Sequence, residues 1–354
     1  MGVIEETVKQ ITGADQAARG KARARLSQLT MPYWALGRLL DLAETLAGIS
    51  GDTSFQVKRK TIVVMAGDHG VTEEGVSLYP KDVTAQMVYN FIAGGAGVNA
   101  IAAVSGARVV VVDMGVDADL SAPGADGKLF NRKIRRATSN MAKGPAMTRD
   151  EAVRSVIAGI ETAMELAPTT DVFGTGDMGI GNTTPSSAIV SVITGKSPAE
   201  VTGRGTGIEE AQWRSKVDVI ERAIKVNQPN PADAFDVLSK VGGFEIGGIA
   251  GLILGSAANK KPVIVDGFIS TAGALIAQAI EPKSADYMIA AHLSVEPGHK
   301  AMLAKLGPRP HLDMDMRLGE GSGAALAMCV VDAAWQAINN IATFESAGVS
   351  KADK

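Results

Sequence analysis

Five short apolar runs, separated by glycine-rich loops and helical segments, most strongly limit what this 354-residue chain can fold into. They are Thr61–Ala66, Arg108–Met114, Thr170–Phe173, Pro262–Asp266 and Tyr287–His292. Each run is continuously apolar instead of alternating, as expected for strands of a parallel sheet that is covered on both faces. The alternation of strands and helices predicts an α/β fold with a Rossmann-like, doubly wound parallel sheet. In such folds ligands bind beyond the carboxyl ends of the strands.

Helix signals lie between the runs. Thr148 to Glu151 forms a capping box that opens a helix ending near Leu166. Pro185 and Pro231 are predicted in the first turns of two further helices, the second of which should end at Gly242. Residues 1–50 are expected to be helical, and a long apolar helix should run from about residue 323 to 344. We expect residues 1–58 and 330–354 to form a small helical domain, and residues 59–329 the large α/β catalytic domain.

Composition excludes several classes of partner. The net charge is −3 and only 4% of residues are aromatic, so the chain offers neither a basic face nor a stacking platform for nucleic acid. Its single cysteine, Cys329, cannot form an internal disulfide and fits a reducing cytoplasm, where we expect the protein. No signal peptide is predicted, and apolar stretches such as residues 247–258 are too short to span a bilayer.

A glycine-rich loop follows the third run, within residues 171–188. Successive backbone N–H groups beside a helix N-terminus form an anion site, and a phosphate is the natural ligand. A tight structural turn and a dinucleotide site are the alternatives, although the acidic residue that a dinucleotide site needs is not evident at the expected spacing. The candidate ligands in this loop are Gly176, Asp177, Gly179, Gly181 and Asn182.

A second glycine-rich loop, residues 202–210, also precedes a helix. Gly205, Thr206 and Gly207 are candidate phosphate ligands there. Lys216 follows two to three helical turns later and either reaches back towards a phosphate or is a solvated surface lysine. A further glycine-rich segment, residues 94–102, matches the dinucleotide fingerprint in its glycine spacing but not in its structural context. Because a helix and not a strand precedes it, we interpret it as a helix–helix junction.

Polar residues follow several of the other strands. Asp68 and His69 follow the first, where a capped turn with His69 bonded to the backbone is favoured over a metal or acid/base pair. Asp266 ends the fourth run and is a candidate for a ribose hydroxyl. Ser294 follows the fifth run and is a candidate for the same phosphate and ribose site. The neighbouring His292, Glu296 and His299 lack a partner at metal-ligand spacing, and a helix starting at Glu296-Pro297 explains them more simply.

A flat aromatic ligand is one explanation for Ser77, Tyr79 and Gln86, which lie beyond the first strand; ordinary loop and helix-surface positions are the other. Nearer the C-terminus, Glu320 lies among three glycines before a long apolar helix, in the segment RLGEGSG. Favourable interaction with the helix dipole is one explanation for Glu320, but it does not by itself account for glycines on both sides; the other explanation is a carboxylate that is free to face a cavity. Asp313 and Asp315 form a D-x-D motif, which is short and common by chance.

Taken together, the segments GDHGV, VTAQMV, GDMGIGNTT, GRGTG, VGGFEIGGIAG, VDGFI and RLGEGSGAALA resemble the nicotinate-nucleotide:dimethylbenzimidazole phosphoribosyltransferases. They occur in the family's order, from about residue 60 to 335. The resemblance implies a Rossmann-like sheet, a small helical domain, a homodimer, and transfer of phosphoribose from β-nicotinate mononucleotide to 5,6-dimethylbenzimidazole. The products would be α-ribazole 5′-phosphate and nicotinate, in assembly of the cobalamin nucleotide loop.

The resemblance also implies residue roles. Glu320 matches the family's catalytic carboxylate, and Gly179, Gly205, Gly207 and Lys216 fall in the matching phosphate and ribose loops. Gln86 and Leu318 fall where the family contacts the base. Two departures stand out. Asp177 replaces a glutamate of many members, and Tyr79 replaces a serine of some.

The implied chemistry suits these residue types. The donor's ring nitrogen is cationic and leaves as a neutral base, so we expect neither a metal nor another cofactor. The acceptor must lose one N–H proton, for which a single general base such as Glu320 suffices. The rival functions are an NAD-dependent oxidoreductase, a metal-dependent glycosyltransferase that uses Asp313 and Asp315, transfer to another aromatic base, and a non-catalytic nucleotide-binding protein.

Overall fold

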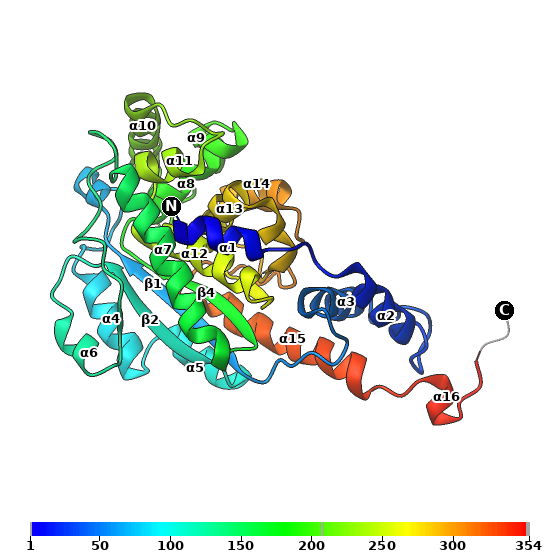
Figure 1. Ribbon diagram of the computed structural model, residues 1–354. Coiled ribbons are helices and arrows are strands. Elements are labelled where there is room, and N and C mark those ends of the chain that lie inside the picture. The colour runs from blue at the N-terminus through cyan, green and yellow to red at the C-terminus, as the bar shows by residue number, and fades with distance from the viewer. Residues whose placement is uncertain (1, 206, 208, 352–354) are drawn as a thin grey trace.

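The computed structural model describes residues 2–205, 207 and 209–351. Within these residues six parallel strands form one sheet in the order β3-β2-β1-β4-β5-β6 (Figure 1). This confirms the predicted α/β fold with a doubly wound parallel sheet. The strands are β1 Lys60–Gly67, β2 Arg108–Gly115, β3 Phe130–Asn131, β4 Val172–Met178, β5 Val263–Val265 and β6 Met288–Ala290.

Helices connect the strands and continue the chain at both ends. The α-helices are α1 Gly2–Gln10, α2 Gln16–Leu26, α3 Arg38–Ser50, α4 Val83–Ala93, α5 Gly97–Ser105, α6 Ser121–Ala125, α7 Arg149–Leu166, α8 Thr183–Thr194, α9 Pro198–Val201, α10 Glu210–Asn227, α11 Ala234–Val241, α12 Phe244–Ala258, α13 Phe268–Ile280, α14 Pro297–Leu306, α15 Ser322–Asn340 and α16 Phe344–Ala347. Short 3₁₀ turns are η1 Gly70–Glu74, η2 Ala167–Thr169 and η3 Pro282–Tyr287.

The central strand β1 is buried on both faces. Its side chains alternate, so that Val63 and Met65 join one apolar cluster while Ile62 and Val64 join another. Helices α7, α12 and α13 contribute to the first cluster, and helices α3, α5 and α15 to the second. Burial on both faces explains why the strand is continuously apolar in sequence.

Helices α7 and α12 lie unusually close together. A Cβ atom on Gly251 would lie 2.0 Å from the carbonyl oxygen of Val156, and one on Gly159 would lie 2.0 Å from the carbonyl oxygen of Gly248. Glycine is therefore required at both contact points. The glycines of α12 give this helix a small face that allows the close approach.

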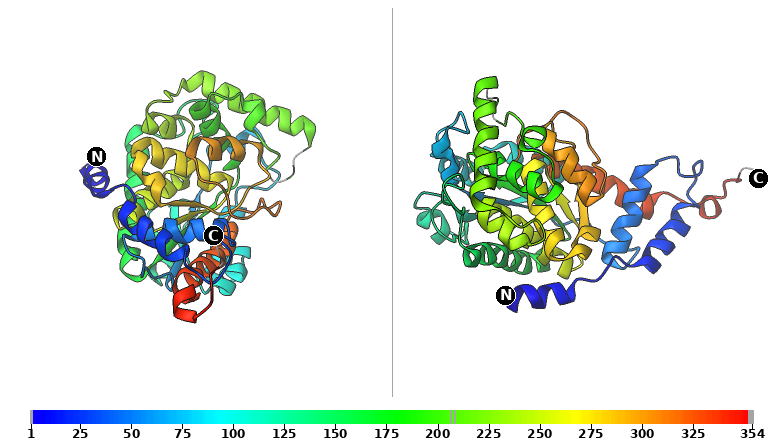
Figure 2. Two further views of the ribbon diagram at one scale, coloured as in Figure 1. Left: turned by 90° about the vertical axis from the view of Figure 1, so that its right-hand side faces the viewer. Right: turned by 90° about the horizontal axis from the view of Figure 1, so that it is seen from above.

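Helices from the N-terminal and C-terminal parts of the chain lie together beyond the sheet. Helices α2 and α3 contact each other and α15, and Figures 1 and 2 show them beside the far end of α15, with α16 beyond. Helix α1 lies apart from this group and contacts α7 and α12. The division into a small helical domain and a large catalytic domain stays a prediction.

Several element boundaries differ from the sequence expectation. Strand β4 continues through Asp177, because Gly174 and Gly176 pair with β1 inside the strand instead of forming a loop after it. Helix α11 begins at Ala234, after Asp233 caps it, so Pro231 lies before its first turn. The last long helix ends at Asn340, and the two-residue strand β3 was not predicted.

The glycine-rich segment 94–102 joins α4 to α5, which confirms the predicted helix–helix junction. The stretch Val83–Ser105 is long and apolar enough to cross a membrane by length and composition alone. It is divided between the two helices, because Gly94 ends α4 in the left-handed conformation with φ +81°.

The strand order reverses direction at β1, which has β2 on one side and β4 on the other. Ligands of doubly wound sheets bind at such a switch point, beyond the carboxyl ends of the strands. Here the ends of β1 and β4 approach closely, since a Cβ atom on Gly179 would lie 2.2 Å from the carbonyl oxygen of Gly67. The fold therefore predicts a ligand site in the loops after β1 and β4.

Candidate active site

A cavity of about 650 Å³ opens at this edge of the sheet. Loops that follow β1, β4, β5 and β6 and the segment before α15 all contribute to it. Its lining consists of Val76, Ser77, Tyr79, Val83, Met87, Asp177, Met178, Gly179, Ile180, Gly181, Asn182, Thr183, Gly205, Gly267, Phe268, Ile269, His292, Ser294, Glu296, Arg317, Leu318, Gly319 and Glu320.

Most of the site residues expected from the sequence meet in this cavity. Those that line it are Ser77, Tyr79, Asp177, Gly179, Gly181, Asn182, Gly205, Ser294, Leu318 and Glu320. Those that the lining does not include are Gln86, Gly176, Gly207, Lys216 and Asp266. Gln86 is exposed on α4, and Gly207 is also exposed. Thr206 lies outside the described residues.

Glu320 is held by an unusual backbone. It adopts a left-handed φ of +63°, between Gly319 at +80° and Gly321 at +93°. A residue other than glycine in this region costs about 1–3 kcal/mol, and such strain concentrates at functional sites. The flanking glycines thus permit a conformation that places the Glu320 side chain before α15 begins at Ser322.

The Glu320 carboxylate bonds to a different helix from the one it precedes. Its Oε2 atom accepts the backbone N–H of Val98, in the first turn of α5, at 3.0 Å. A Cβ atom on Gly97 would lie only 3.1 Å from the same oxygen. Burial raises the pKa of Glu320, while the N–H groups of Val98 and Gly97 lower it. The residue is 7% exposed, so the structure buries a titratable carboxyl group against the cavity.

Asp177 lies near Glu320 at the end of β4. Its Oδ2 atom accepts Nδ2–H of Asn182 at 2.9 Å, and both residues line the cavity. Burial raises the pKa of Asp177 well above its usual range, and the nearby carboxylates of Asp266, Glu245 and Glu320 raise it further.

A buried cation lies beneath the start of α8. Lys216 is 1% exposed, and its Nζ atom donates to Oγ1 of Thr183 at 2.8 Å. Burial lowers its pKa to about 8, and the carboxylate of Glu296 opposes that shift. Thr183, Gly205 and Glu296 line the cavity, so Lys216 lies directly behind the lining and not on the solvated face of α10.

Two residues predicted as ligands make structural contacts. Asp266 is fully buried, and its carboxylate accepts the N–H groups of Gly321 at 3.3 Å and Ala324 at 2.8 Å. It therefore binds the N-terminus of α15 and fixes the segment that carries Glu320. A Cβ atom on Gly176 would lie 2.4 Å from the Glu320 carbonyl oxygen, so this glycine accommodates the backbone of the same segment.

Helix α14 begins at Pro297 after Glu296, which confirms the helix start predicted beside the histidines. His69 Nε2 lies 2.9 Å from Glu245 Oε1 in a fully buried pair, and the predicted bond of His69 to the backbone stays a prediction. Burial lowers the His69 pKa, but the adjacent carboxylate more than offsets this and leaves it raised. Asp68 does accept a backbone N–H, from Asp117 at 2.8 Å. His299 accepts the Ser294 N–H at 2.9 Å, which fixes a loop of the cavity.

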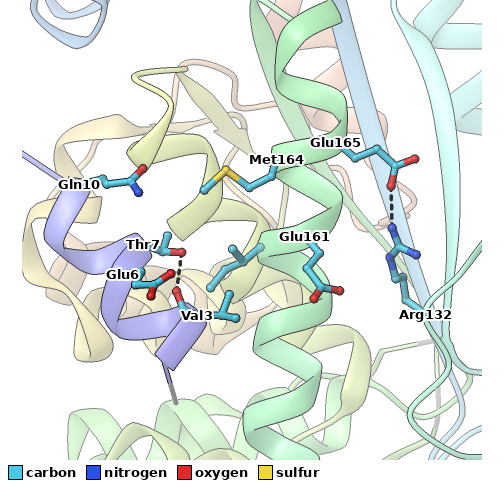
Figure 3. Close-up of a pocket in the computed structure, with 9 residues that line it drawn as sticks. Val3, Glu6, Thr7, Gln10, Arg132, Glu161, Met164 and Glu165 are labelled. Atoms are coloured by element: carbon cyan, nitrogen blue, oxygen red, sulfur yellow. Dashed lines mark hydrogen bonds and ion pairs between the residues drawn. The ribbon is translucent and has the colours of Figure 1, made fainter.

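A second cavity, of about 340 Å³, lies between α1 and α7 (Figure 3). Figure 3 shows Thr7 bonded to the carbonyl oxygen of Val3, and Arg132 bonded to Glu165 at 2.6 Å. Its remaining charged lining residues are Glu6 and Glu161. This acidic lining disfavours an anionic ligand, whereas the larger cavity combines glycine amides with a buried lysine.

Sequence reasoning missed part of the apolar lining. Val83, Met87 and Phe268 line the cavity although they have the helical spacing of ordinary core residues. Arg317 also lines it, next to the predicted Leu318. The one available signal for these lining residues was their position in the sequence. Each of them lies near the start of a helix or loop that follows a strand. Asp313 and Asp315 are exposed and do not line the cavity.

Comparison with known proteins shows the family of the chain. A phosphoribosyltransferase family model matches residues 11–349. The nicotinate-nucleotide–dimethylbenzimidazole phosphoribosyltransferase of Syntrophotalea carbinolica is 56% identical over 351 residues, covering 99% of each chain. That of Desulfotalea psychrophila is 53% identical and covers both chains completely. The crystal structure of CobT from Thermus thermophilus superposes with a TM-score of 0.90 at 44% identity, covering 95% of this chain and all of that one. The chain therefore belongs to the nicotinate-nucleotide–dimethylbenzimidazole phosphoribosyltransferase family.

Proposed function

We propose that the protein transfers phosphoribose from β-nicotinate mononucleotide to 5,6-dimethylbenzimidazole, giving α-ribazole 5′-phosphate and nicotinate for cobalamin nucleotide loop assembly. One observation carries the proposal. The same cavity joins Glu320, a buried carboxylate held in a strained conformation, to glycine amides backed by the buried Lys216. A carboxylate suits a proton acceptor, and the amides and lysine suit a phosphate.

The phosphate of the donor is assigned to the region between α8 and Gly205. Thr183 begins α8, whose N-terminus favours an anion, and Lys216 donates to its hydroxyl group. Gly205 also lines the cavity, and its backbone N–H, which Glu296 accepts, is the amide assigned to the phosphate. The ribose then lies near Asp177, Asn182 and Ser294, which continue the lining from this end.

The acceptor base is assigned to the apolar side of the cavity. We define the apolar rim as Tyr79, Val83, Met87 and Leu318, all of which line the cavity. Gln86 is exposed on the same helix as Val83 and Met87 and is not part of the lining, and its contact with the base stays a prediction. A flat aromatic ring fits between such side chains and gains free energy by leaving water.

Glu320 acts as the general base in this scheme. An acceptor nitrogen attacks C1′ of the donor from the face opposite nicotinate, the C1′–N bond breaks, and nicotinate leaves as a neutral ring. The bond changes invert C1′ from β to α. The other acceptor nitrogen loses its proton to a Glu320 carboxylate oxygen. Its raised pKa makes this carboxylate a better proton acceptor than an exposed glutamate.

Nothing in the site favours the oxidoreductase alternative. The dinucleotide fingerprint needs its first glycines at a strand–helix turn, but Gly174 and Gly176 lie inside β4. Cβ atoms at these positions would lie 3.3 Å or less from α15 or the segment that precedes it. These glycines are therefore accounted for by packing.

We further infer that the protein works as a cytoplasmic homodimer without nucleic-acid or membrane partners. The acidic net charge and single cysteine support the compartment and the lack of such partners. Exposed apolar side chains at the cavity entrance, Tyr79 and Leu318, support a covering partner. Residues 1–58 and 330–354 remain assigned to a small helical domain, which the contacts of α2 and α3 with α15 support.

The reaction itself tests the proposal. Purified protein is incubated with nicotinate mononucleotide and 5,6-dimethylbenzimidazole in the presence of a metal chelator, and products are followed by mass. We expect α-ribazole 5′-phosphate and free nicotinate in equal amounts. Binding of the donor without product would point to another acceptor base. Absence of both product and donor binding would contradict the proposal.

A further inference from the structure

A third carboxylate, Glu296, occupies the end of the cavity to which the donor's phosphate is assigned. It precedes α14, is 6% exposed and lines the cavity. Its Oε1 atom accepts the N–H of Gly205 at 3.1 Å. That amide is one of the donors that a bound phosphate needs, so the protein's own carboxylate already uses it.

The surroundings are shaped to receive this side chain. A Cβ atom on Gly203 would lie only 1.8 Å from Oε2 of Glu296, so only glycine leaves room for the carboxylate. Within the described part of the chain, this Oε2 is buried and has no hydrogen-bond partner. An oxygen that lies unbonded in a phosphate subsite is free to interact with a ligand.

The charged groups that face Glu296 are Lys216 from α10 and Arg317 from the segment before α15. Burial raises the pKa of Glu296, while these two cations and the Gly205 N–H lower it. An ionised Glu296 therefore competes with any incoming phosphate for the Gly205 amide and for the positive charge of Lys216, whose Nζ atom bonds to Thr183. Two anions cannot use the same donors without strong repulsion, which protonation of one of them removes.

We propose that Glu296 fills the phosphate subsite of the donor-free protein and takes up one proton from solvent when the donor's phosphate binds. The inference rests on the proposed function, which places the phosphate at this end. The protonated carboxyl group donates its O–H to a phosphate oxygen, and the Gly205 N–H is released to the phosphate. Donor affinity should then fall by up to tenfold per unit as the pH rises above the pKa of Glu296 in the free protein.

Calorimetry measures this proton directly. Nicotinate mononucleotide is titrated into the protein at pH 6.5 in two buffers of different ionisation enthalpy. At that pH Lys216, with its pKa of about 8, is already protonated and contributes little. Wild-type protein should take up more protons than Glu296→Gln, by a difference approaching one. The Gln side chain keeps the shape and the acceptor for Gly205 and removes only the charge.

Affinity and a matched control complete the design. At pH 7.5 Glu296→Gln should bind the donor fivefold or more tightly than wild type. Glu345→Gln, which changes the net charge equally on the exposed helix α16, should behave as wild type. With wild-type protein alone, nicotinate riboside, which lacks the phosphate, should bind without the extra proton. This last arm does not depend on how the variant folds.

The outcomes are separable. Equal proton uptake by wild type and Glu296→Gln, weaker binding by the variant, or equal uptake with the riboside would each overturn the role of Glu296 while leaving the proposed function standing. Failure of wild-type protein to bind nicotinate mononucleotide at all would overturn the proposed function and, with it, this inference.

Discussion

Two groups of residues at the cavity, which we call its buried side and its exposed side, differ in how firmly the fold holds them. On one side, Lys216, Glu296 and Glu320 are at most 7% exposed and each is bonded to a neighbouring loop or helix. On the other, Tyr79 and Leu318 are 55% and 57% exposed. Proton transfer and phosphate binding need fixed, desolvated groups. A flat apolar base needs only an apolar surface to bind. From this contrast we expect the protein to be strict in the reaction that it catalyses and tolerant in the acceptor base that it accepts.

The buried side should respond most strongly to loss of its general base. Glu320→Gln removes the proton acceptor and keeps a side-chain oxygen for the Val98 N–H. We expect kcat/KM to fall by about 10²–10⁴-fold with little change in thermal stability. In wild type, kcat/KM should also fall as the pH drops through the raised pKa of Glu320, because only the ionised form accepts a proton. Asp313→Asn, at an exposed carboxylate, is the matched control.

Loss of the buried cation should act on donor binding. Lys216→Met removes a charged donor, worth about 1.5–3 kcal/mol, so KM for nicotinate mononucleotide should rise by roughly 10- to 100-fold. In wild type, kcat/KM for the donor should fall above pH 8, where Lys216 loses its proton. Lys225→Met on the exposed face of the same helix should leave both quantities unchanged. A normal KM for nicotinate mononucleotide in Lys216→Met would contradict the assignment of the phosphate to this end of the cavity.

Loss of Asp266, which fixes the segment that carries Glu320, should lower stability as well as activity. Asp266→Ala leaves the N–H groups of Gly321 and Ala324 buried without their acceptor. We expect the free energy of unfolding, measured with urea, to fall by about 1–3 kcal/mol. Activity should fall with little change in KM for the donor. A variant with normal stability and a raised KM would instead make Asp266 a ligand.

The exposed side should respond least. Tyr79→Ser removes an aromatic surface that is already half in water, so we expect KM for the base to rise by less than about tenfold, with kcat nearly unchanged. Tyr89→Ser, equally exposed but outside the lining, is the control. A loss as large as that of Glu320→Gln would abolish the distinction between the two sides.

The sequence predicted most of the sheet, because strands buried on both faces form continuous apolar runs such as Thr61–Ala66. It failed at the end of β4, where Gly174 and Gly176 indicated a loop. Glycine is unusual inside a strand, and here it makes room for Met328 and the Glu320 backbone. Only tertiary packing against α15 reveals that reason.

The site was predictable where local pattern carries chemistry. Glu320 and the glycine loops were identified because flanking glycines and strand ends are visible in sequence. The partners of these residues were not, since they lie far away along the chain. Val98 is 222 residues from Glu320, and Ala324 is 58 residues from Asp266. The segment at 94–102 carried no chemical signal of its own, yet it provides the N–H that holds the Glu320 carboxylate.

The role of Glu320 is tested most directly by an acceptor that has no proton to lose. Benzothiazole is flat and similar in size to benzimidazole, but carries sulfur in place of the N–H group. Release of nicotinate is measured in single turnovers for wild type and Glu320→Gln with both acceptors. General-base catalysis predicts a loss of at least about 100-fold with benzimidazole and little loss with benzothiazole. An equal loss with both acceptors would contradict proton removal by Glu320.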